Sequence, residues 1–272
     1  MNVFLNGGNI YYVERGEPEQ MPVTFLHGFP FSHEMWSGQL KAVGERYRAI
    51  AYDIRGHGQS DVLDGQYTIE GHVDDLIALL DHLGIETTVV VGLSMGGYIT
   101  LRALQRNPER FAAAVLCDTR SEADANDAKL KRFEAIRAVK EHGSAHFAAS
   151  FVKAVFAPQT FERSPDTVAF IQKIIARTPP LSIAGSLIAL ASRMDTTPSL
   201  QQISVPTLVM VGEEDVVTPP SASRLIHDRI KGSQLAIIPH AAHMSNLENP
   251  RSFNEHLLSF LERLKPSRRG YR

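Results

Sequence analysis

The chain has 272 residues, of which 43% are hydrophobic and 21% charged, and its formal net charge at pH 7 is -2. This length fits one large α/β domain or two small ones, and the near-neutral charge provides no long-range field that favours nucleic acid or an anionic membrane. The single cysteine, Cys117, excludes an internal disulfide and the usual zinc sites built from several cysteines.

The N-terminal residues do not have the pattern of a secretory signal. Residues 1–16 lack a basic segment followed by an apolar one, and no run reaches the roughly 18 apolar residues that span a bilayer. The basic residues after Lys265 indicate a solvated, frayed terminus rather than a binding patch. We therefore expect a soluble cytoplasmic protein that binds neither nucleic acid nor a membrane.

Short apolar runs alternate with helical patterns, which favours a mainly parallel sheet with helices on both faces. The first predicted strand forms an antiparallel edge with a segment around residues 3–5. Cys117 ends one of the runs, so we expect it to be a small buried side chain. The predicted strands are residues 10–13, 23–26, 48–52, 89–92, 113–117, 207–211 and 235–238.

The helices between these strands are indicated by apolar residues that recur with helical spacing and by residues typical of helix starts and ends. One follows Thr68 and ends at Gly84, and its apolar residues recur with helical spacing. A second lies between Thr218 and Gly232, and the last begins at Asn249-Pro250.

From residue 120 to residue 200 the alternation stops. This stretch predicts consecutive helices at residues 122–141, 144–156, 165–177 and 181–193, with Gly143 and Ser164-Pro165 at two boundaries. We expect residues 1–119 and 201–272 to form the core and residues 120–200 to form a helical lid over an active site. The alternative is that these helices only enlarge the fold.

Ser94 lies between an apolar strand and a helix that ends near Asn107, in the sequence Gly92-Leu-Ser-Met-Gly96. Gly-x-Ser-x-Gly in a strand–turn–helix context is typical of a nucleophile elbow. The glycines allow strand and helix to close on each other, because a Cβ at either position would clash. The alternative is an ordinary serine cap, which would not need both glycines.

A serine nucleophile needs a base and an orienting carboxylate. Four acids that follow strands compete for the second role: Glu213, Glu214, Asp215 and Asp118. Two histidines, His240 and His243, follow the last strand. Their spacing also allows a metal pair, but no third ligand is placed nearby, so we expect no metal.

Acyl transfer also needs donors for the developing oxyanion. The backbone N–H of Met95, directly after Ser94, is one candidate. The backbone N–H of Phe29, in the loop Leu26-His-Gly-Phe-Pro30, is the other.

Five segments resemble the α/β-hydrolase superfamily, and together they cover essentially the whole chain. They are HGFPFSHEMW at 27–36, DIRGHGQS at 53–60, GLSMGG at 92–97, VGEEDVVTPP at 211–220 and AAHMSNLENP at 241–250. The resemblance implies an eight-stranded, mainly parallel sheet with an inserted helical cap. It also selects Asp215, which ends a Gly-x-x-Asp turn, and His243. Glycine is common in the family where this chain has His240.

Within the superfamily the chain most resembles the 3-oxoadipate enol-lactonase-like esterases, through AAHMSNLENP, VGEEDVVTPP and CDTRSEADAN. The loop LHGFPFSHEMW departs from those lactonases and is more like that of a general esterase. The resemblance implies a serine carboxylesterase or lactonase without a cofactor. Its small ester or lactone would form an acyl-enzyme on Ser94, with His243 and Asp215.

We expect Phe29, Trp36, Met95 and Val216 to line the acyl side of the pocket. Three other activities share the same triad: carbon–carbon bond hydrolysis, cofactor-free perhydrolysis and acyl transfer. A ligand receptor that retains the fold is the alternative of another class. The sequence does not determine the oligomeric state.

Overall fold

The computed structural model describes residues 1–264, so the predicted frayed terminus after Lys265 lies outside the described residues. An eight-stranded sheet runs through the molecule in the order β1-β2-β4-β3-β5-β6-β7-β8. Its strands are β1 (Asn2–Leu5), β2 (Gly8–Arg15), β3 (Pro22–Leu26), β4 (Arg48–Tyr52), β5 (Thr88–Leu93), β6 (Phe111–Cys117), β7 (Thr207–Gly212) and β8 (Gln234–Ile238).

The sheet confirms the predicted topology. β1 and β2 pair antiparallel at one edge, β2 pairs antiparallel with β4, and every pairing from β4 to β8 is parallel. Because parallel strands end at the same edge, the loops after β3, β5, β6, β7 and β8 all leave the sheet on one side. That edge is where the predicted site residues lie in the sequence.

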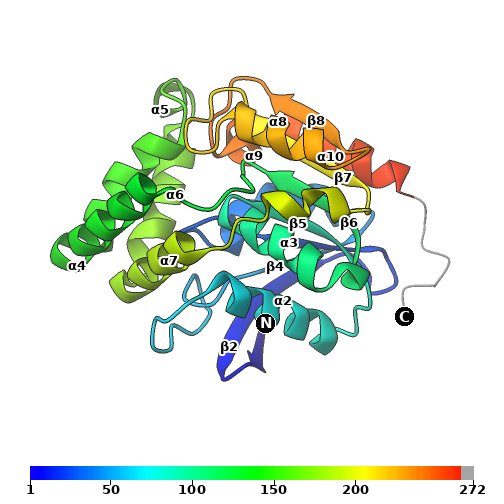
Figure 1. Ribbon diagram of the computed structural model, residues 1–272, viewed down its shortest axis with the longest axis horizontal. Helices are drawn as coiled ribbons and strands as arrows, with labels where there is room; N and C mark the ends of the chain where they lie inside the picture. Colours follow the sequence, from blue (N-terminus) through cyan, green and yellow to red (C-terminus); the bar gives the residue numbers. More distant parts are fainter. Residues whose placement is uncertain (265–272) are drawn as a thin grey trace.

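Helices cover both faces of the sheet (Figure 1). On one face, α1 (Ser37–Val43) and α10 (Pro250–Arg263) contribute apolar residues such as Leu40 and Phe253 to a buried cluster. On the other face lie α2 (Ile69–His82), α3 (Met95–Arg106) and α8 (Pro220–Arg229). Cys117 is completely buried, as predicted.

The chain between β6 and β7 is helical, and these helices lie together beyond one end of the sheet (Figure 1). We call α4 (Asn126–Val155), α5 (Thr160–Arg163), α6 (Pro165–Arg177) and α7 (Pro180–Ser192) the helical insert. α4 is interrupted at Gly143, whose φ of 79° is not helical. Within residues 1–264 no single helix is long and apolar enough to cross a membrane; α6 and α7 pass that test only together, and they meet at 96°.

Two details of the insert differ from the prediction. The first helix begins at Asn126 rather than at residue 122, because the preceding residues bind arginines of the insert instead. Asp124 accepts hydrogen bonds from Arg132 and Arg193, and the Glu122 carbonyl accepts another from Arg193. The four-residue helix α5 was also not predicted. Outside the insert, the short helices α1 and α9 (Ser245–Glu248) were not predicted either.

Candidate active site

Ser94 lies at the junction of β5 and α3 with a strained backbone. Its φ of 54° and ψ of -112° fall outside the region that residues with a side chain normally adopt. Although it occupies the first position before α3, its side chain makes no capping hydrogen bond. The serine is therefore not an ordinary cap.

The neighbouring glycines permit this turn by close backbone approach. A Cβ on Gly92 would lie 2.3 Å from the Gly96 carbonyl oxygen, and a Cβ on Gly96 would lie 2.3 Å from the Leu26 carbonyl oxygen. The turn is fixed from below, since the Ser94 amide donates to the Cys117 carbonyl and the Thr119 hydroxyl donates to the Ser94 carbonyl. The strand, the turn and the helix are thus locked together.

Asp215 and His243 lie in contact beyond β7 and β8. The His243 Nδ1 is 2.8 Å from Asp215 Oδ2, and both side chains are almost completely buried. Thr218 completes the pair: its hydroxyl donates to Asp215 Oδ2 at 2.8 Å and lies 3.2 Å from His243 Nδ1. The amides of Val217 and Thr218 donate to Asp215 Oδ1.

These contacts determine the protonation of both groups. Burial alone would raise the pKa of Asp215, but the charge and hydrogen bond of His243, with the donors from Thr218, lower that pKa below its usual value. Burial alone would lower the pKa of His243, but Asp215 and the more distant carboxyl groups raise it above 6.5. Asp215 is therefore the ionised partner that favours an imidazolium.

The structure does not join Ser94 to His243 by a hydrogen bond. Since Nδ1 faces Asp215, the other ring nitrogen, Nε2, is the one available to the serine, and within residues 1–264 no side chain or amide occupies it. Catalytic hydrogen bonds are often long without substrate and tighten when it binds. Ser94 follows β5 and His243 follows β8, and because the strands from β5 to β8 are parallel, both residues lie at the same edge of the sheet.

The other candidate acids and the second histidine have different environments. Asp118 is completely buried and accepts from the Gly212 amide at 2.8 Å and from the Ser245 hydroxyl. Burial, aided by the charge of Asp215, raises its pKa well above the ordinary value. Glu213 is exposed, and so is His240, which lies on a backbone with φ of 56°.

Two backbone amides are free to serve as oxyanion donors. Met95 is the first residue of α3, where an amide has no acceptor within the helix. The Phe29 amide has no hydrogen-bond partner among residues 1–264. The structure thus leaves both predicted donors unused.

The side chains predicted to line the pocket differ in their surroundings. Phe29 packs against Phe147 and Phe151 of α4, with ring centroids 6.0 and 5.7 Å apart. The Met95 side chain is completely buried beside Phe29 in the same apolar cluster. Val216 is 79% exposed, at the rim of the loop that carries Asp215.

Trp36 has a different location from the one predicted. It has no exposed surface and packs in the core against Phe25 and Phe253. Its cluster also contains residues of α1 and α10, on one face of the sheet. We expect a side chain with no exposed surface to support the fold rather than to contact the substrate.

Several residues near the site were not predicted from the sequence. The sequence predicts Thr218 only as the start of a helix, and the bond from its hydroxyl to the Asp215 carboxylate was not expected. Glu248 of α9 and the insert residues Phe147 and Phe151 carry no such local signal. Their partners lie far away in the chain.

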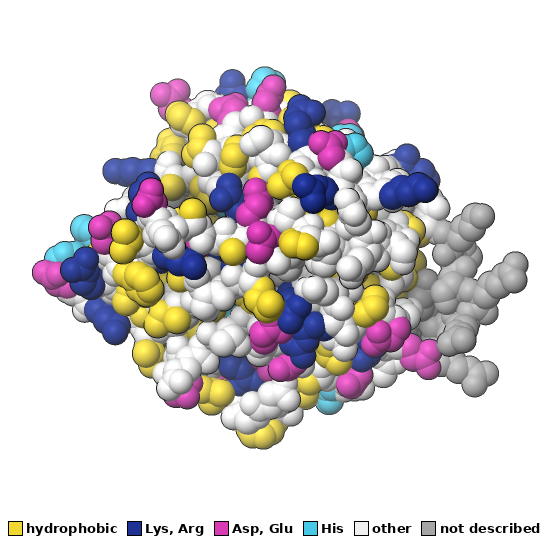
Figure 2. Space-filling view, in the orientation of Figure 1, with side chains coloured by type: hydrophobic (Ala, Val, Ile, Leu, Met, Phe, Trp, Pro, Cys, Tyr) yellow, Lys and Arg dark blue, Asp and Glu magenta, His cyan; other side chains and the backbone are white. Residues whose placement is uncertain are grey.

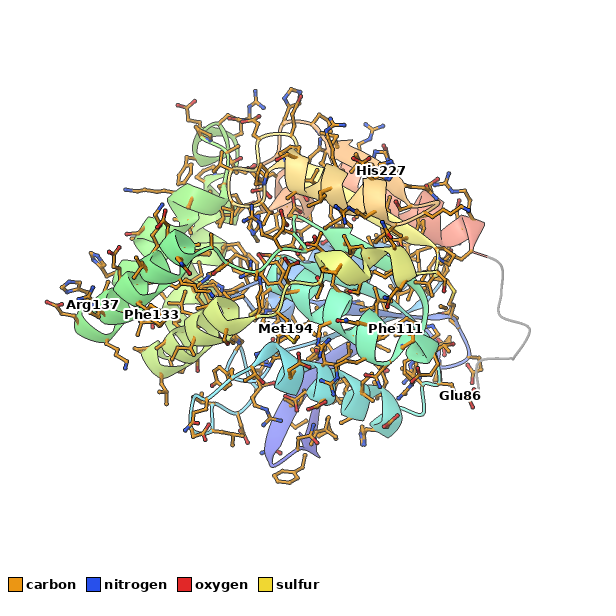
Figure 3. All side chains as sticks on the ribbon, in the orientation of Figure 1. Glu86, Phe111, Phe133, Arg137, Met194 and His227 are labelled. Carbon is orange, nitrogen blue, oxygen red and sulfur yellow. The ribbon has the colours of Figure 1, made fainter. Side chains whose placement is uncertain are left out.

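The described residues away from this edge do not form a metal site. Among the described residues no group of three histidine, cysteine, aspartate or glutamate side chains is placed to hold a metal ion. On the face shown in Figure 2, cationic and anionic side chains are interspersed. Phe133 and Arg137 project from the outer side of the insert, away from the sheet (Figure 3).

The chain is similar to known proteins over most of its length. A sequence model of the α/β hydrolase fold matches residues 21–250. The chain is 31% identical over 252 residues to 3-oxoadipate enol-lactonase 2 of Acinetobacter baylyi, covering 93% of this chain and 92% of the relative.

Two solved structures are also similar. A thermophilic esterase from Thermogutta terrifontis superposes with a TM-score of 0.92 at 31% identity, covering 97% of both chains. The enol-lactonase from Burkholderia xenovorans LB400 gives a TM-score of 0.91 at 27% identity, covering 96% of this chain and all of the other.

Proposed function

The chain belongs to the α/β-hydrolase fold family, and from this premise we propose that it is a serine hydrolase of small carboxylic esters or lactones that works through an acyl-enzyme. One observation carries the proposal: the strained, uncapped Ser94 lies at the same sheet edge as the buried Asp215–His243 pair. The similarity to enol-lactonases and to an esterase supports the class of bond cleaved.

In the first half of the reaction the Ser94 Oγ attacks the carbonyl carbon while its proton passes to His243 Nε2. The amides of Phe29 and Met95 donate to the oxyanion of the tetrahedral intermediate. When the intermediate collapses, the carbon–oxygen bond to the leaving group breaks and His243 returns the proton to the leaving alkoxide. For a lactone, the alcohol stays attached to the acyl chain.

In the second half His243 takes a proton from water, whose oxygen attacks the acyl-enzyme carbonyl. The second intermediate expels Ser94 Oγ, which regains the proton from His243, and the carboxylic acid leaves. Asp215 keeps the imidazole proton on Nδ1 throughout and stabilises the imidazolium. No cofactor takes part in either half.

Residues 120–200 act in this proposal as a lid. The aromatic residues Phe147 and Phe151 of this lid contact Phe29, the residue whose amide donates to the oxyanion. With Met95 and the exposed Val216 they bound the acyl side of the substrate. We expect these aromatic rings to favour short acyl groups over long ones.

The test compares wild-type protein and Ser94→Ala on p-nitrophenyl esters from acetate to octanoate, together with an enol-lactone. Ser150→Ala, a change at an exposed serine of α4, is the matched control. We expect wild type and control to turn over short esters or the lactone, and Ser94→Ala to lose on the order of 10³-fold or more in kcat/KM. Folded wild-type protein that cleaves none of these substrates would contradict the proposal.

A further inference from the structure

One short segment of the helical insert contacts the loops of both Asp215 and His243. This segment, residues 157–160, lies between α4 and α6. The Gln159 side-chain amide donates to Glu214 Oε1 at 2.6 Å, next to Asp215. The remaining contacts pass through a single carboxylate, that of Glu248 in α9.

The two oxygens of Glu248 face different parts of the molecule. Oε1 accepts from the insert, namely from the Ala157 amide at 2.8 Å and from the Thr160 hydroxyl. Oε2 accepts from the Ala242 amide at 2.7 Å, in the residue directly before His243. One side chain thus connects the lid to the loop of the catalytic histidine.

Every group that bonds to the Glu248 carboxylate is a donor: the Ala157 and Ala242 amides and the Thr160 hydroxyl. A carboxylate can accept all of these bonds, whereas a protonated acid would turn an O–H toward an N–H. Burial raises the pKa of Glu248 above its usual value, and the donors oppose that rise. The all-donor surroundings favour a negatively charged bridge.

That charge acts on His243. Three carboxyl groups face the imidazole and favour its charged form: Asp215 in direct contact, Asp118 after β6, and Glu248. Only Glu248 of these three also contacts the insert. A change at this residue therefore affects both the position and the titration of the histidine.

We propose that Glu248 is a positioning residue that joins residues 157–160 of the insert to the His243 loop. Through this bridge the insert holds the His243 imidazole in the position that proton transfer requires. The inference rests on the proposed function for its kinetic consequence. Misplacement of a catalytic group by about 1 Å can cost on the order of 10²-fold in rate. Loss of the bridge should therefore lower kcat more than it changes KM.

The experiment uses Glu248→Gln, which preserves shape but places an NH₂ group against a donor on one side of the bridge. Thr160→Val removes only the hydroxyl on the insert side, and it provides a readout if the glutamine variant does not fold. Glu213→Gln is the matched control, because this exposed glutamate lies in the Asp215 loop and its side chain accepts from the His240 amide rather than bonding to residues 157–160. kcat, KM and the pH profile of p-nitrophenyl acetate hydrolysis are measured for each protein.

The His243 titration is also followed by NMR of ¹⁵N-histidine-labelled protein. We expect Glu248→Gln to lower kcat roughly 10-fold with KM nearly unchanged, and to move both the acidic limb and the His243 titration to lower pH. Thr160→Val should lower kcat by less, and Glu213→Gln should change none of these. A purely structural bridge would change the level of activity but not the titration.

Wild-type kcat and an unmoved His243 titration in Glu248→Gln would overturn the inference, and so would an equal shift in Glu213→Gln. If Glu248→Gln does not fold, a wild-type kcat in Thr160→Val overturns it. The NMR titration needs no turnover, so it still tests the bridge if the wild-type protein cleaves no ester. Failure of the proposed function and failure of this inference are thus distinguished.

Discussion

Two buried carboxyl groups at the same sheet edge have opposite protonation behaviour. Burial raises the pKa of Asp118, and the charge of Asp215 raises it further. His243 and Thr218 overcome the same effect of burial at Asp215, whose pKa is lowered. A carboxyl group that tends to remain neutral stabilises an imidazolium less than an ionised one does, and Asp215 is the carboxylate bonded to His243 Nδ1, so Asp215 is the acid in our account.

This difference predicts unequal effects of two asparagine substitutions. Asp215→Asn should lower kcat/KM by on the order of 10⁴-fold, because the amide no longer fixes the imidazole tautomer or stabilises its charge. Asp118→Asn should cost less than about 10-fold, because an amide can still accept from Gly212 and donate to Ser245. A larger loss in Asp118→Asn than in Asp215→Asn would reverse the assignment.

At the residue scale, position at the end of a strand predicts which chain segments meet. Asp215 and His243 each follow an apolar run, parallel strands bring such positions together, and their side chains are in contact. Strand position left four acids open, and the family resemblance selected Asp215. Thr160 and Glu248 could not be paired in this way, because 88 residues separate them and only the packed insert brings them together. The burial of Trp36 could not be predicted either, because it depends on packing against Phe253, which lies far away in the chain.

At the scale of elements, the strand–turn–helix around Ser94 leaves no room for added atoms. A Cβ on Gly96 would meet the Leu26 carbonyl oxygen of β3, which is held in the sheet between β4 and β5. Neither side can move without loss of strand pairing. A change that disturbs the turn at Ser94 should therefore also lower the stability of the core.

Gly96→Ala should lower the free energy of unfolding by about 3 kcal/mol or more, since overpacking against backbone cannot be relieved by a rotamer change. Gly38→Ala is the matched control: Gly38 lies in α1 with open space at its Cβ, and alanine there should add roughly 0.5–1 kcal/mol. Guanidinium unfolding of both variants measures the difference. Equal stabilities would show that the close approach at Gly96 is not tight.

The predicted elements were most accurate where one period or one cap dominates. Thr68 caps α2 by accepting from the Gly71 amide, as its position before an apolar stripe predicts. The insert was less predictable at its base, where residues before Asn126 bind Arg193 instead of continuing the helix. Such a choice is determined by a partner about 70 residues away rather than by local propensity.

At the scale of the whole molecule, buried histidines link stability to pH. His27, His57 and His72 are almost completely buried, and the ring centroids of His27 and His57 lie 5.2 Å apart. Burial, with mutual repulsion of the rings, lowers the pKa of His27 and His72 to about 3, and burial lowers that of His57 as well. The folded protein therefore holds these rings neutral at pH values where the unfolded chain protonates them.

Between about pH 6.5 and 3 the unfolded state binds more protons, so the free energy of unfolding should decrease as pH falls. His72→Phe should reduce this slope by about 1.4 kcal/mol per pH unit in that range. The phenyl ring of phenylalanine fits this site, because His72 Nε2 has no hydrogen-bond partner among the described residues that the substitution would remove. Urea unfolding from pH 7 to 4.5 tests this, with exposed His256→Gln as the control that should keep the wild-type slope; an unchanged slope in His72→Phe would refute the linkage.

The central claim is that Ser94 is a nucleophile activated by His243. The most direct test is to treat the folded protein with a fluorophosphonate and to map the labelled peptide by mass spectrometry. Our account predicts one phosphonyl group per chain on Ser94, and almost none on Ser94→Ala or His243→Ala. Folded wild-type protein that stays unlabelled, or that is labelled at another residue, would contradict it.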